Sequence, residues 1–377
     1  MQEKTYPWWS PVMGAREKEL LSQVIDSGFP NDGPFTEKFE NELAAFLGAK
    51  YAVAVTSCTA GLYLSLMALG IGSGDEVLVP DITFIATANA VSMTGAKAVL
   101  VDVNKADFCI DFAAMRKALS SKTRAIIPVH VSGRAPDMER LLAFAQEHNL
   151  KVIEDAAEAL GSKTLGKYLG TLGLSGAFSF SPAKTITTGQ GGLIVTNSEE
   201  IHGRLRELKD QGRPKRGTGG NDTHVSLGFN FKFTDLQAAM GLAQLETLSE
   251  RLKKLQKHYE CYKAALADNG RVRLPEFDTA AGACPQWIDA YVEEDRDGLY
   301  EYLKQRNADC RKFWFPLHTQ NPYLSDDADY KNSIDVSKKS LWLPSSLNLE
   351  EADIYKVAEF VNDWAKLPSA RTAAGAR

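Results

Sequence analysis

Seven short runs of mostly apolar residues, separated by segments with helical periodicity, constrain the fold of this chain most strongly. They lie near 51–56, 76–80, 98–103, 124–130, 151–155, 176–180 and 192–196, and they are rich in Val and Ile. Several are apolar throughout, which is typical of parallel strands that helices cover on both faces. The pattern predicts one large α/β domain with a mainly parallel seven-stranded sheet.

Helices are predicted between these strands and after them. The first is expected to follow Thr36, whose side chain can cap free backbone N–H groups. Later helices are predicted at 200–210, 234–263, 296–307 and 349–366. A basic loop rich in glycine, from Gly212 to Gly220, lies between the first two of these.

The chain of 377 residues is too long for one small core, and its pattern changes near residue 264. From there the sequence is typical of a smaller α+β unit with an aromatic segment at 313–316. We expect a large domain over 1–250, which includes the N-terminal segment, and a small C-terminal domain over 251–366. The polar tail over 367–377 is expected to be disordered.

Composition argues against several classes of protein. A net charge of −5 argues against general nucleic-acid binding, which needs a concentrated basic face. Five scattered cysteines without a Cys-x-x-Cys pair fit reduced thiols, and the six histidines show no metal-ligand spacing. No apolar run approaches the roughly 20 residues that span a bilayer. We therefore expect a cytoplasmic protein without a metal site, a membrane partner or a nucleic-acid partner.

Asp155 ends the apolar run at 151–155, and open parallel sheets bind ligands at the carboxyl ends of their strands. A carboxylate buried there needs a cationic partner, because burying an unpaired charge is costly. A protonated ring nitrogen, such as a pyridinium, would serve. The alternative is a helix N-cap, and this residue alone leaves the two interpretations even.

Lys184 follows the run at 176–180 among small residues, with Gly189-Gln-Gly-Gly192 close behind it. This position is poorly suited to a salt bridge on a helix face. A lysine amine becomes a nucleophile toward carbonyl groups when it is desolvated or lies near another cation. The alternative is a solvated loop lysine, which is the commoner fate of this residue type.

Two further strand ends carry residues suited to a ligand. Ser57-Cys58-Thr59 lies at a strand-to-helix junction, where free backbone N–H groups and the positive end of a helix suit a phosphate. The alternative is a plain N-cap. Phe84 follows the run at 76–80 and could cover a flat ring, although an aromatic residue there is more often part of the core.

In combination and in this order, the motifs resemble the DegT/DnrJ/StrS family of sugar aminotransferases, which are fold-type I pyridoxal-phosphate enzymes. The resemblance covers about residues 10 to 365 and implies an aspartate-aminotransferase-like fold. The matching stretches are Gly74-Asp-Glu-Val-Leu-Val-Pro80, Thr83-Phe84, Ala86-Thr-Ala-Asn89, Val129-His130, Glu154-Asp155-Ala156, Phe178-Ser179-Phe180 before Lys184, Gly191-Gly192, Phe229-Asn230 and Pro316-Leu-His318-Thr319.

The resemblance implies roles for four residues around the cofactor ring. Lys184 would bind pyridoxal 5′-phosphate as a Schiff base and shuttle the proton, and Asp155 would pair with the ring nitrogen. Phe84 would stack on the ring. Glu158 would lie near the ring hydroxyl, where relatives more often have Gln.

The resemblance also implies a phosphate site that two subunits share. Cys58 and Thr59 would bind the phosphate through backbone N–H groups, with the hydroxyls of Thr59 and Ser179. Asn230 would reach it from the neighbouring subunit of a homodimer. Cys58 stands where the family usually has Gly, and Lys232 stands where many relatives have Arg.

The implied reaction is amino transfer from L-glutamate to a nucleotide-linked keto sugar. Stretches such as Thr185-Ile-Thr and Leu343-Pro-Ser-Ser resemble the perosamine-synthase branch, which aminates C4 of a 4-keto-6-deoxy sugar. The basic loop could bind the diphosphate, although a solvated surface loop is its alternative. The expected substrate contacts are Arg213, Lys215, Arg216, Trp314 and His318; Trp287 could also lie beside the sugar, and both Trp287 and Trp314 are equally plausible as core residues.

Three alternatives stand beside this hypothesis. A pyridoxal-phosphate-dependent sugar dehydratase or deoxygenase is disfavoured, because relatives that dehydrate have His at the position of Lys184. A pathway regulator without enzymatic activity would leave the pair of Lys184 and Asp155 unexplained. A nicotinamide-dependent Rossmann enzyme is disfavoured, because Gly-x-Gly-x-x-Gly follows none of the predicted strands.

Overall fold

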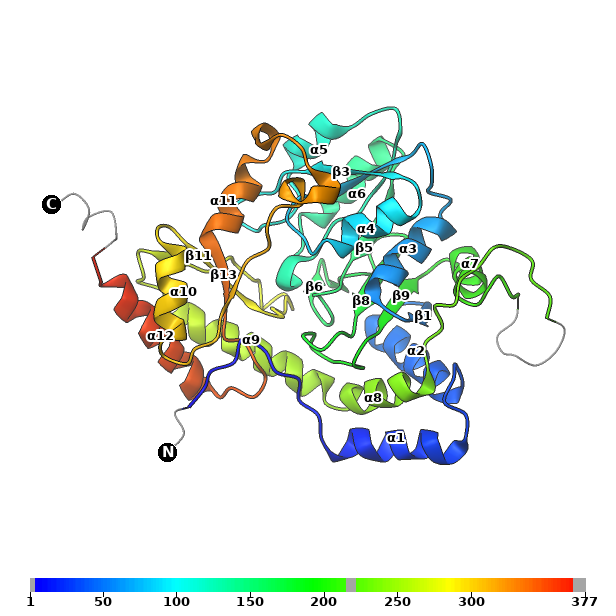
Figure 1. Cartoon of the computed structure of the whole chain (residues 1–377), viewed down its shortest axis with the longest axis horizontal. Helices are drawn as coiled ribbons and strands as arrows, with labels where there is room; N and C mark the ends of the chain where they lie inside the picture. Colours follow the sequence, from blue (N-terminus) through cyan, green and yellow to red (C-terminus); the bar gives the residue numbers. More distant parts are fainter. Residues whose placement is uncertain (1–3, 215–221, 369–377) are drawn as a thin grey trace.

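The computed structural model describes residues 4–214 and 222–368, and a seven-stranded sheet lies at its centre (Figure 1). The strand order is β1-β9-β8-β5-β4-β2-β3. β9 is antiparallel to both neighbours, and the other adjacent strands pair in parallel. All seven predicted strands are confirmed, in one mainly parallel sheet. Their bounds are Tyr51–Val55 (β1), Glu76–Pro80 (β2), Lys97–Val101 (β3), Thr123–Ile126 (β4), Lys151–Asp155 (β5), Ser175–Ser179 (β8) and Gly192–Thr196 (β9).

Helices cover both faces of this sheet and continue into the C-terminal part of the chain (Figure 1). Within the described ranges, every helix is too short or too polar to cross a bilayer. The helix bounds are Ala15–Ser27 (α1), Pro34–Leu47 (α2), Cys58–Ala68 (α3), Ala86–Met93 (α4), Phe112–Ala118 (α5), Met138–Glu147 (α6), Glu199–Lys209 (α7), Asp235–Leu245 (α8), Leu248–Ala265 (α9), Arg296–Lys304 (α10), Lys331–Lys339 (α11) and Glu351–Ala365 (α12).

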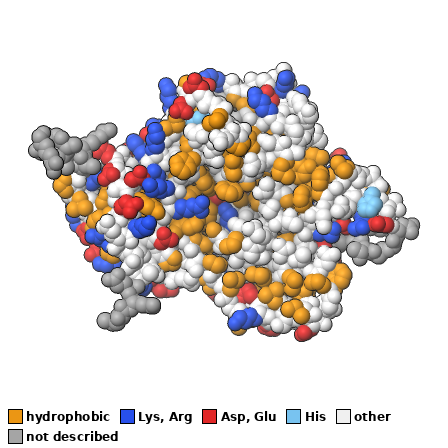
Figure 2. Space-filling model, viewed as in Figure 1, with side chains coloured by type: hydrophobic (Ala, Val, Ile, Leu, Met, Phe, Trp, Pro, Cys, Tyr) orange, Lys and Arg blue, Asp and Glu red, His pale blue; other side chains and the backbone are white. Residues whose placement is uncertain are grey.

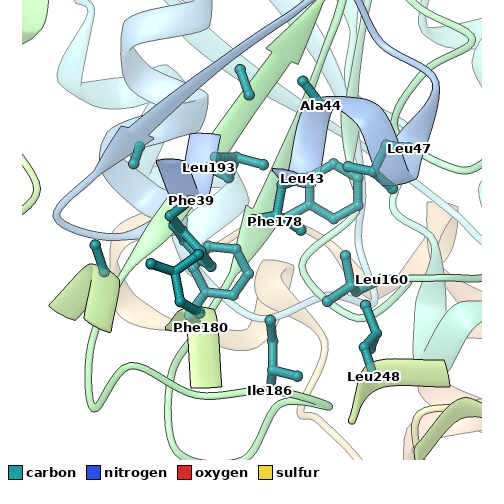
Figure 3. Close-up of a cluster of buried hydrophobic side chains, with 14 of the residues drawn as sticks. Phe39, Leu43, Ala44, Leu47, Leu160, Phe178, Phe180, Ile186, Leu193 and Leu248 are labelled. Atoms are coloured by element: carbon teal, nitrogen blue, oxygen red, sulfur yellow. The ribbon is translucent and has the colours of Figure 1, made fainter. Parts of the chain in front are cut away.

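Side chains of the strands pack into two apolar clusters, one on each face of the sheet. In β1, Ala54 joins the cluster that α2 and α8 cover, whereas Val55 joins the cluster beneath α3. Figure 3 shows the first cluster, where Phe39 of α2 meets Phe178 of β8 and Leu193 of β9. Because successive side chains of a strand point to opposite faces, a strand that is apolar throughout fills both clusters.

The prediction that Thr36 caps a helix is wrong. α2 begins at Pro34, and Gly33 is its N-cap. Thr36 is fully buried in the first turn, and its hydroxyl donates a hydrogen bond of 2.7 Å to Oδ1 of Asp235. The same carboxylate accepts the backbone N–H groups of Gly33, Phe35 and Thr36 at 2.9, 3.2 and 2.8 Å. The free N–H groups of α2 are therefore satisfied by the first residue of α8, which is distant in sequence.

The helix predicted over 234–263 is two helices. Thr234 caps α8 in a capping box with Gln237, whose N–H donates to Oγ1 of Thr234 at 3.3 Å. α8 ends at Leu245, and α9 begins at Leu248. The break lets α8 pack on the large sheet while α9 continues to the C-terminal part, where Tyr262 is fully buried.

The smaller C-terminal part is α+β, as predicted. Its antiparallel sheet has the order β10-β11-β13-β12 and packs with α9, α10 and α12. Tyr6 packs in the same core, so the first described residues lie on this part of the chain and not on the large sheet. The domain boundary near residue 250 stays a prediction, and the predicted disordered tail lies outside the described residues from 369 onward. The strand bounds are Val272–Arg273 (β10), Ile288–Val292 (β11), Arg311–Lys312 (β12) and Ser340–Leu343 (β13).

The buried carboxylate of Asp235 leads to a prediction about stability. Asp235→Ala removes a charged acceptor from three backbone N–H groups and one hydroxyl. We expect the free energy of unfolding to fall by about 2–4 kcal/mol in a denaturant titration followed by circular dichroism. Asp26→Ala, on the exposed surface of α1, is the control and should change stability by less than about 0.5 kcal/mol. Equal stability of the two variants would show that Asp235 does not anchor α2.

Candidate active site

A cavity of about 300 Å³ opens at the carboxyl ends of the parallel strands, where the large sheet meets the C-terminal part. Its walls come from the junction of β1 and α3, the segment after β2, the ends of β5 and β8, and the segment that begins with β12. The cavity therefore lies where open parallel sheets bind their ligands. The predicted cofactor residues that line it are Cys58, Thr59, Phe84, Asp155, Glu158, Ser179 and Lys184.

Asp155 is the last residue of β5, and only 5% of it is exposed. Oγ1 of Thr87 donates a hydrogen bond of 2.7 Å to its Oδ2, and the N–H of Ala157 donates one of 3.1 Å to its Oδ1. Burial raises the pKa of Asp155, although both hydrogen bonds act in the opposite direction. A cation in the cavity would stabilise the carboxylate, so the position fits a protonated ring nitrogen.

Lys184 lies in a turn after β8, where its N–H bonds to the carbonyl of Ser181 at 3.1 Å. Its Nζ is 3.3 Å from Oε1 of Glu158 and 4.6 Å from the centre of the Trp287 ring. Glu158 also accepts the N–H of Ser132 at 2.9 Å, and burial raises the pKa of its carboxyl. A carboxylate and an aromatic face thus hold the amine inside the cavity, which excludes the solvated loop lysine of the alternative interpretation.

The N-terminus of α3 forms a further corner of the cavity. Ser57 is its N-cap and accepts the N–H of Ala60 at 3.1 Å, while the first turn offers the N–H groups of Cys58 and Thr59. A Cβ on Gly192 would come within 2.6 Å of the Cys58 nitrogen, so glycine permits the close approach of β9. Burial raises the pKa of the Cys58 thiol well above its ordinary value, which keeps this side chain neutral. The corner therefore suits an anionic phosphate.

Together these groups fit pyridoxal phosphate. Asp155 suits the ring nitrogen, Lys184 suits the carbonyl carbon, and the N-terminus of α3 suits the phosphate. Ser179 adds a hydroxyl at the end of β8, and Phe84 adds an aromatic ring that is 57% exposed. Across the described ranges, no group of His, Cys, Asp and Glu side chains is arranged to hold a metal ion.

Of the residues expected to contact the substrate, the structure places Trp314 in the cavity wall and His318 elsewhere. His318 is fully buried: Nδ1 lies 2.7 Å from Oδ2 of Asp81, and Nε2 lies 3.2 Å from Oδ1 of Asp327. Its ring also stacks on Tyr330 at 4.2 Å between centroids. Because both ring nitrogens have partners, His318 has a structural position here and does not line the cavity.

Arg213 and Asn230 also lie outside the cavity. Arg213 pairs with Oδ1 of Asp222 at 2.6 Å and with Oδ1 of Asp210 at 3.2 Å. Asn230 is exposed and accepts a hydrogen bond of 2.8 Å from Nζ of Lys232. Lys215 and Arg216, which were also expected to contact the substrate, fall outside the described residues.

Three residues of the site were not predicted from the sequence. Thr87 bonds to Asp155, and its hydroxyl lies 3.0 Å from that of Thr83, four residues earlier. Ser132 acts through its backbone N–H, which no side-chain motif can indicate. Arg311 lines the cavity together with Trp314, and its nearness to the predicted aromatic segment was the one available signal.

Comparisons with known proteins identify the family of this chain. The chain matches the DegT/DnrJ/EryC1/StrS aminotransferase family over residues 11–362. GDP-perosamine synthase of Caulobacter vibrioides is 37% identical over 359 residues, which are 92% of this chain and 95% of that protein. GDP-perosamine synthase of Escherichia coli O157:H7 is 33% identical over 362 residues, which are 96% of this chain and 99% of that protein. The structure of DesI in the presence of its TDP-sugar product has a TM-score of 0.89 at 27% identity, covering 100% of this chain and 97% of DesI.

The family match spans nearly the whole chain, and the two relatives match it over nearly their own full lengths. The resemblance inferred from the motifs is therefore confirmed. The chain belongs to the DegT/DnrJ/EryC1/StrS aminotransferase family, and it is an aminotransferase whose cofactor is pyridoxal 5′-phosphate.

Proposed function

We propose that this aminotransferase moves the amino group of L-glutamate to a nucleotide-linked keto sugar, a 4-keto-6-deoxy hexose. The observation that carries the proposal is the single cavity in which Lys184, Asp155 and the N-terminus of α3 lie together. The sugar class is supported by two relatives that are GDP-perosamine synthases and by DesI, whose structure was determined in the presence of its TDP-sugar product.

The residues of the cavity would divide the binding of the cofactor among them. When bound, pyridoxal phosphate supplies an electron sink for the carbon that gains or loses the amino group. Asp155 would keep the ring nitrogen protonated, and Glu158 would bond to the ring hydroxyl. Thr59 and Ser179 would hold the phosphate with the N–H groups of α3, and Phe84 would cover one face of the ring.

Lys184 would carry the proton in both halves of the reaction. Its Nζ would accept a proton from the α-carbon of the amino donor and deliver one to the acceptor carbon of the sugar. Glu158, at 3.3 Å, orients the amine and balances its charge. A lysine at this place favours amino transfer over the dehydration that histidine-bearing relatives perform.

We also propose a homodimer in which the subunits share their sites. The segment that carries Asn230 exposes 58% of Val225 and 74% of Leu227, although both are large apolar residues. Ile25 and Phe29 at the end of α1 are also exposed, and Figure 2 shows hydrophobic side chains gathered at the lower right, over α1 and α8. A second subunit would remove these apolar surfaces from water and would bring Asn230 to the phosphate.

The basic loop remains a proposed site for the nucleotide diphosphate. Lys215 and Arg216 would supply cationic donors to the phosphate oxygens. Arg213 would have to exchange its pairs with Asp210 and Asp222 for the ligand. We place the enzyme in the cytoplasm, because all five cysteines are free thiols and such thiols are typical of a reducing compartment.

The first test concerns Lys184. Borohydride reduction of the holoenzyme followed by peptide mapping should place the pyridoxyl group on Lys184, because its Nζ lies in the cavity with Asp155. Lys184→Arg should lose at least about 1,000-fold in turnover, since it removes the proton carrier. Lys163→Arg, in the hairpin formed by β6 (Lys163–Thr164) and β7 (Lys167–Tyr168), is the control and should keep wild-type turnover. A label on another lysine would refute the assignment.

A second test concerns Asp155. Asp155→Ala should lower the rate of the glutamate half-reaction at least about 100-fold, because the carboxylate acts mainly as charge develops on the ring. The cofactor dissociation constant should change much less. Both are measured from cofactor absorbance, by stopped flow and by titration. Thr87→Ser, which keeps the hydroxyl donor to Asp155, should retain most of the rate. A near wild-type rate in Asp155→Ala would reduce this residue to a structural cap.

A third test addresses the shared site. Lys184→Ala and Asn230→Ala should each be nearly inactive as homodimers. Hybrids of the two chains should regain up to about half of wild-type activity per dimer, because one of the two sites then carries neither change. Tandem affinity tags isolate the hybrids, and mass photometry verifies their composition. Hybrids that stay inactive would place Asn230 in the site of its own subunit.

A further inference from the structure

Arg311 and Lys312, the two residues of β12, have different surroundings. The two side chains of this strand point to opposite faces. Lys312 pairs with Oδ1 of Asp297 at 2.9 Å and lies over the Tyr300 ring. Arg311 lines the cavity that contains Lys184. Lys312 therefore has a carboxylate partner, whereas no described carboxylate pairs with Arg311, which lines the cavity.

The guanidinium of Arg311, an exposed residue, lies beside two aromatic rings. Its Cζ lies 5.1 Å from the centre of the Trp8 ring and 5.6 Å from that of Trp342. Trp8 in turn packs at 5.1 Å against Trp287, the ring that contacts Nζ of Lys184. Among residues 4–214 and 222–368, no side chain or carbonyl forms a hydrogen bond or ion pair with the guanidinium of Arg311. Its planar set of N–H donors therefore remains available while its ring contacts restrict its position.

The proposed reaction already assigns a role to each of the other charged side chains in the cavity. Asp155 would pair with the ring nitrogen, Lys184 would bind the cofactor and carry the proton, and Glu158 pairs with Lys184. The N–H groups at the start of α3 serve the phosphate. Among the described residues that line the cavity, Arg311 is the remaining cation. An amino-acid donor brings a carboxylate into the same space, and the described lining offers this anion no other free cation.

We infer that Arg311 binds the α-carboxylate of the amino donor. The inference rests on the proposed function for the identity of the donor as an amino acid. The α-carboxylate is attached directly to the carbon that loses its proton to Lys184, so it must enter this cavity with that carbon. In a nucleotide sugar, the pyranose ring separates the reacting C4 from the diphosphate, which must lie farther out. Two parallel N–H donors of a guanidinium match the two oxygens of a carboxylate.

The test uses the holoenzyme with glutamate alone, followed through the cofactor absorbance. In Arg311→Gln, the glutamate concentration for the half-maximal rate should rise about 10- to 100-fold, as expected for the loss of a charged hydrogen-bonded pair. Arg311→Lys should lie between wild type and Arg311→Gln, because it keeps the charge and loses the planar donor pair. Lys312→Gln is the matched control and should behave as wild type. The KM for the sugar nucleotide should stay unchanged in all three variants.

A binding measurement without turnover completes the test. Glutarate, a dicarboxylate without an amino group, should quench or shift the fluorescence of the tryptophans beside Arg311. Its dissociation constant should rise in Arg311→Gln by a factor similar to that for glutamate, and it should not change in Lys312→Gln.

Three results would overturn the inference. Unchanged glutamate and glutarate constants in Arg311→Gln, with normal cofactor absorbance, would leave Arg311 without this role. A rise confined to the KM for the sugar nucleotide would assign the guanidinium to the diphosphate. Loss of cofactor absorbance in both Arg311 variants would show that the Arg311 side chain supports cofactor binding instead. The proposed acceptor fails separately, if glutamate reacts normally and no nucleotide-linked keto sugar yields an amine.

Discussion

The end of β5 carries two buried carboxylates, Glu154 and Asp155. Much of the site depends on the difference in the number of hydrogen bonds that the two accept. Glu154 is fully buried and accepts four hydrogen bonds, from Nε2 of His130 at 2.8 Å and from the N–H groups of Gly170, Leu172 and Gly173 at 2.8, 2.6 and 2.6 Å. Asp155, the next residue, accepts two and faces the cavity. Because adjacent strand residues point to opposite faces, one carboxylate organises the fold and the other remains available to a ligand.

This difference explains why the carboxyl edge of the sheet can bind a ligand and is not simply packed against other parts of the chain. A carboxylate has about four lone-pair positions, and Asp155 uses two of them. The cost of its burial is visible in its raised pKa and is offset when a cation enters. β8 lies beside β5 in the sheet, so the turn after β8 brings Lys184 to the same cavity. The parallel arrangement therefore places the acid and the amine together although they are 29 positions apart in the sequence.

Local sequence patterns predicted the helices and strands of this protein well. Features that depend on contacts between residues distant in sequence could not be predicted in this way. The seven strands and the positions of Asp155 and Lys184 follow from runs of apolar residues and from where those runs end. The start of α2 could not be predicted, because Asp235, about 200 residues away, caps it. His318 matched a family motif, yet in the fold it is buried and hydrogen-bonded to Asp81. For Arg311 the only local signal was its nearness to the predicted aromatic segment, and the place of its side chain in the cavity depends on the fold.

The C-terminal part does more than close the cavity, because it also supports the lysine. Ser132 has a φ of 51°, which costs a residue other than glycine about 1–2 kcal/mol. Contacts on both sides hold it there: its N–H donates to Glu158 at 2.9 Å, and its hydroxyl donates to Oδ1 of Asp289 in β11 at 2.9 Å. Arg134 pairs with the other oxygen of Asp289. A chain of bonds thus leads from the C-terminal sheet through Ser132 and Glu158 to the amine of Lys184. The two parts of the chain must therefore pack correctly before the amine is oriented, which couples the fold of the C-terminal sheet to chemistry at the end of the parallel one.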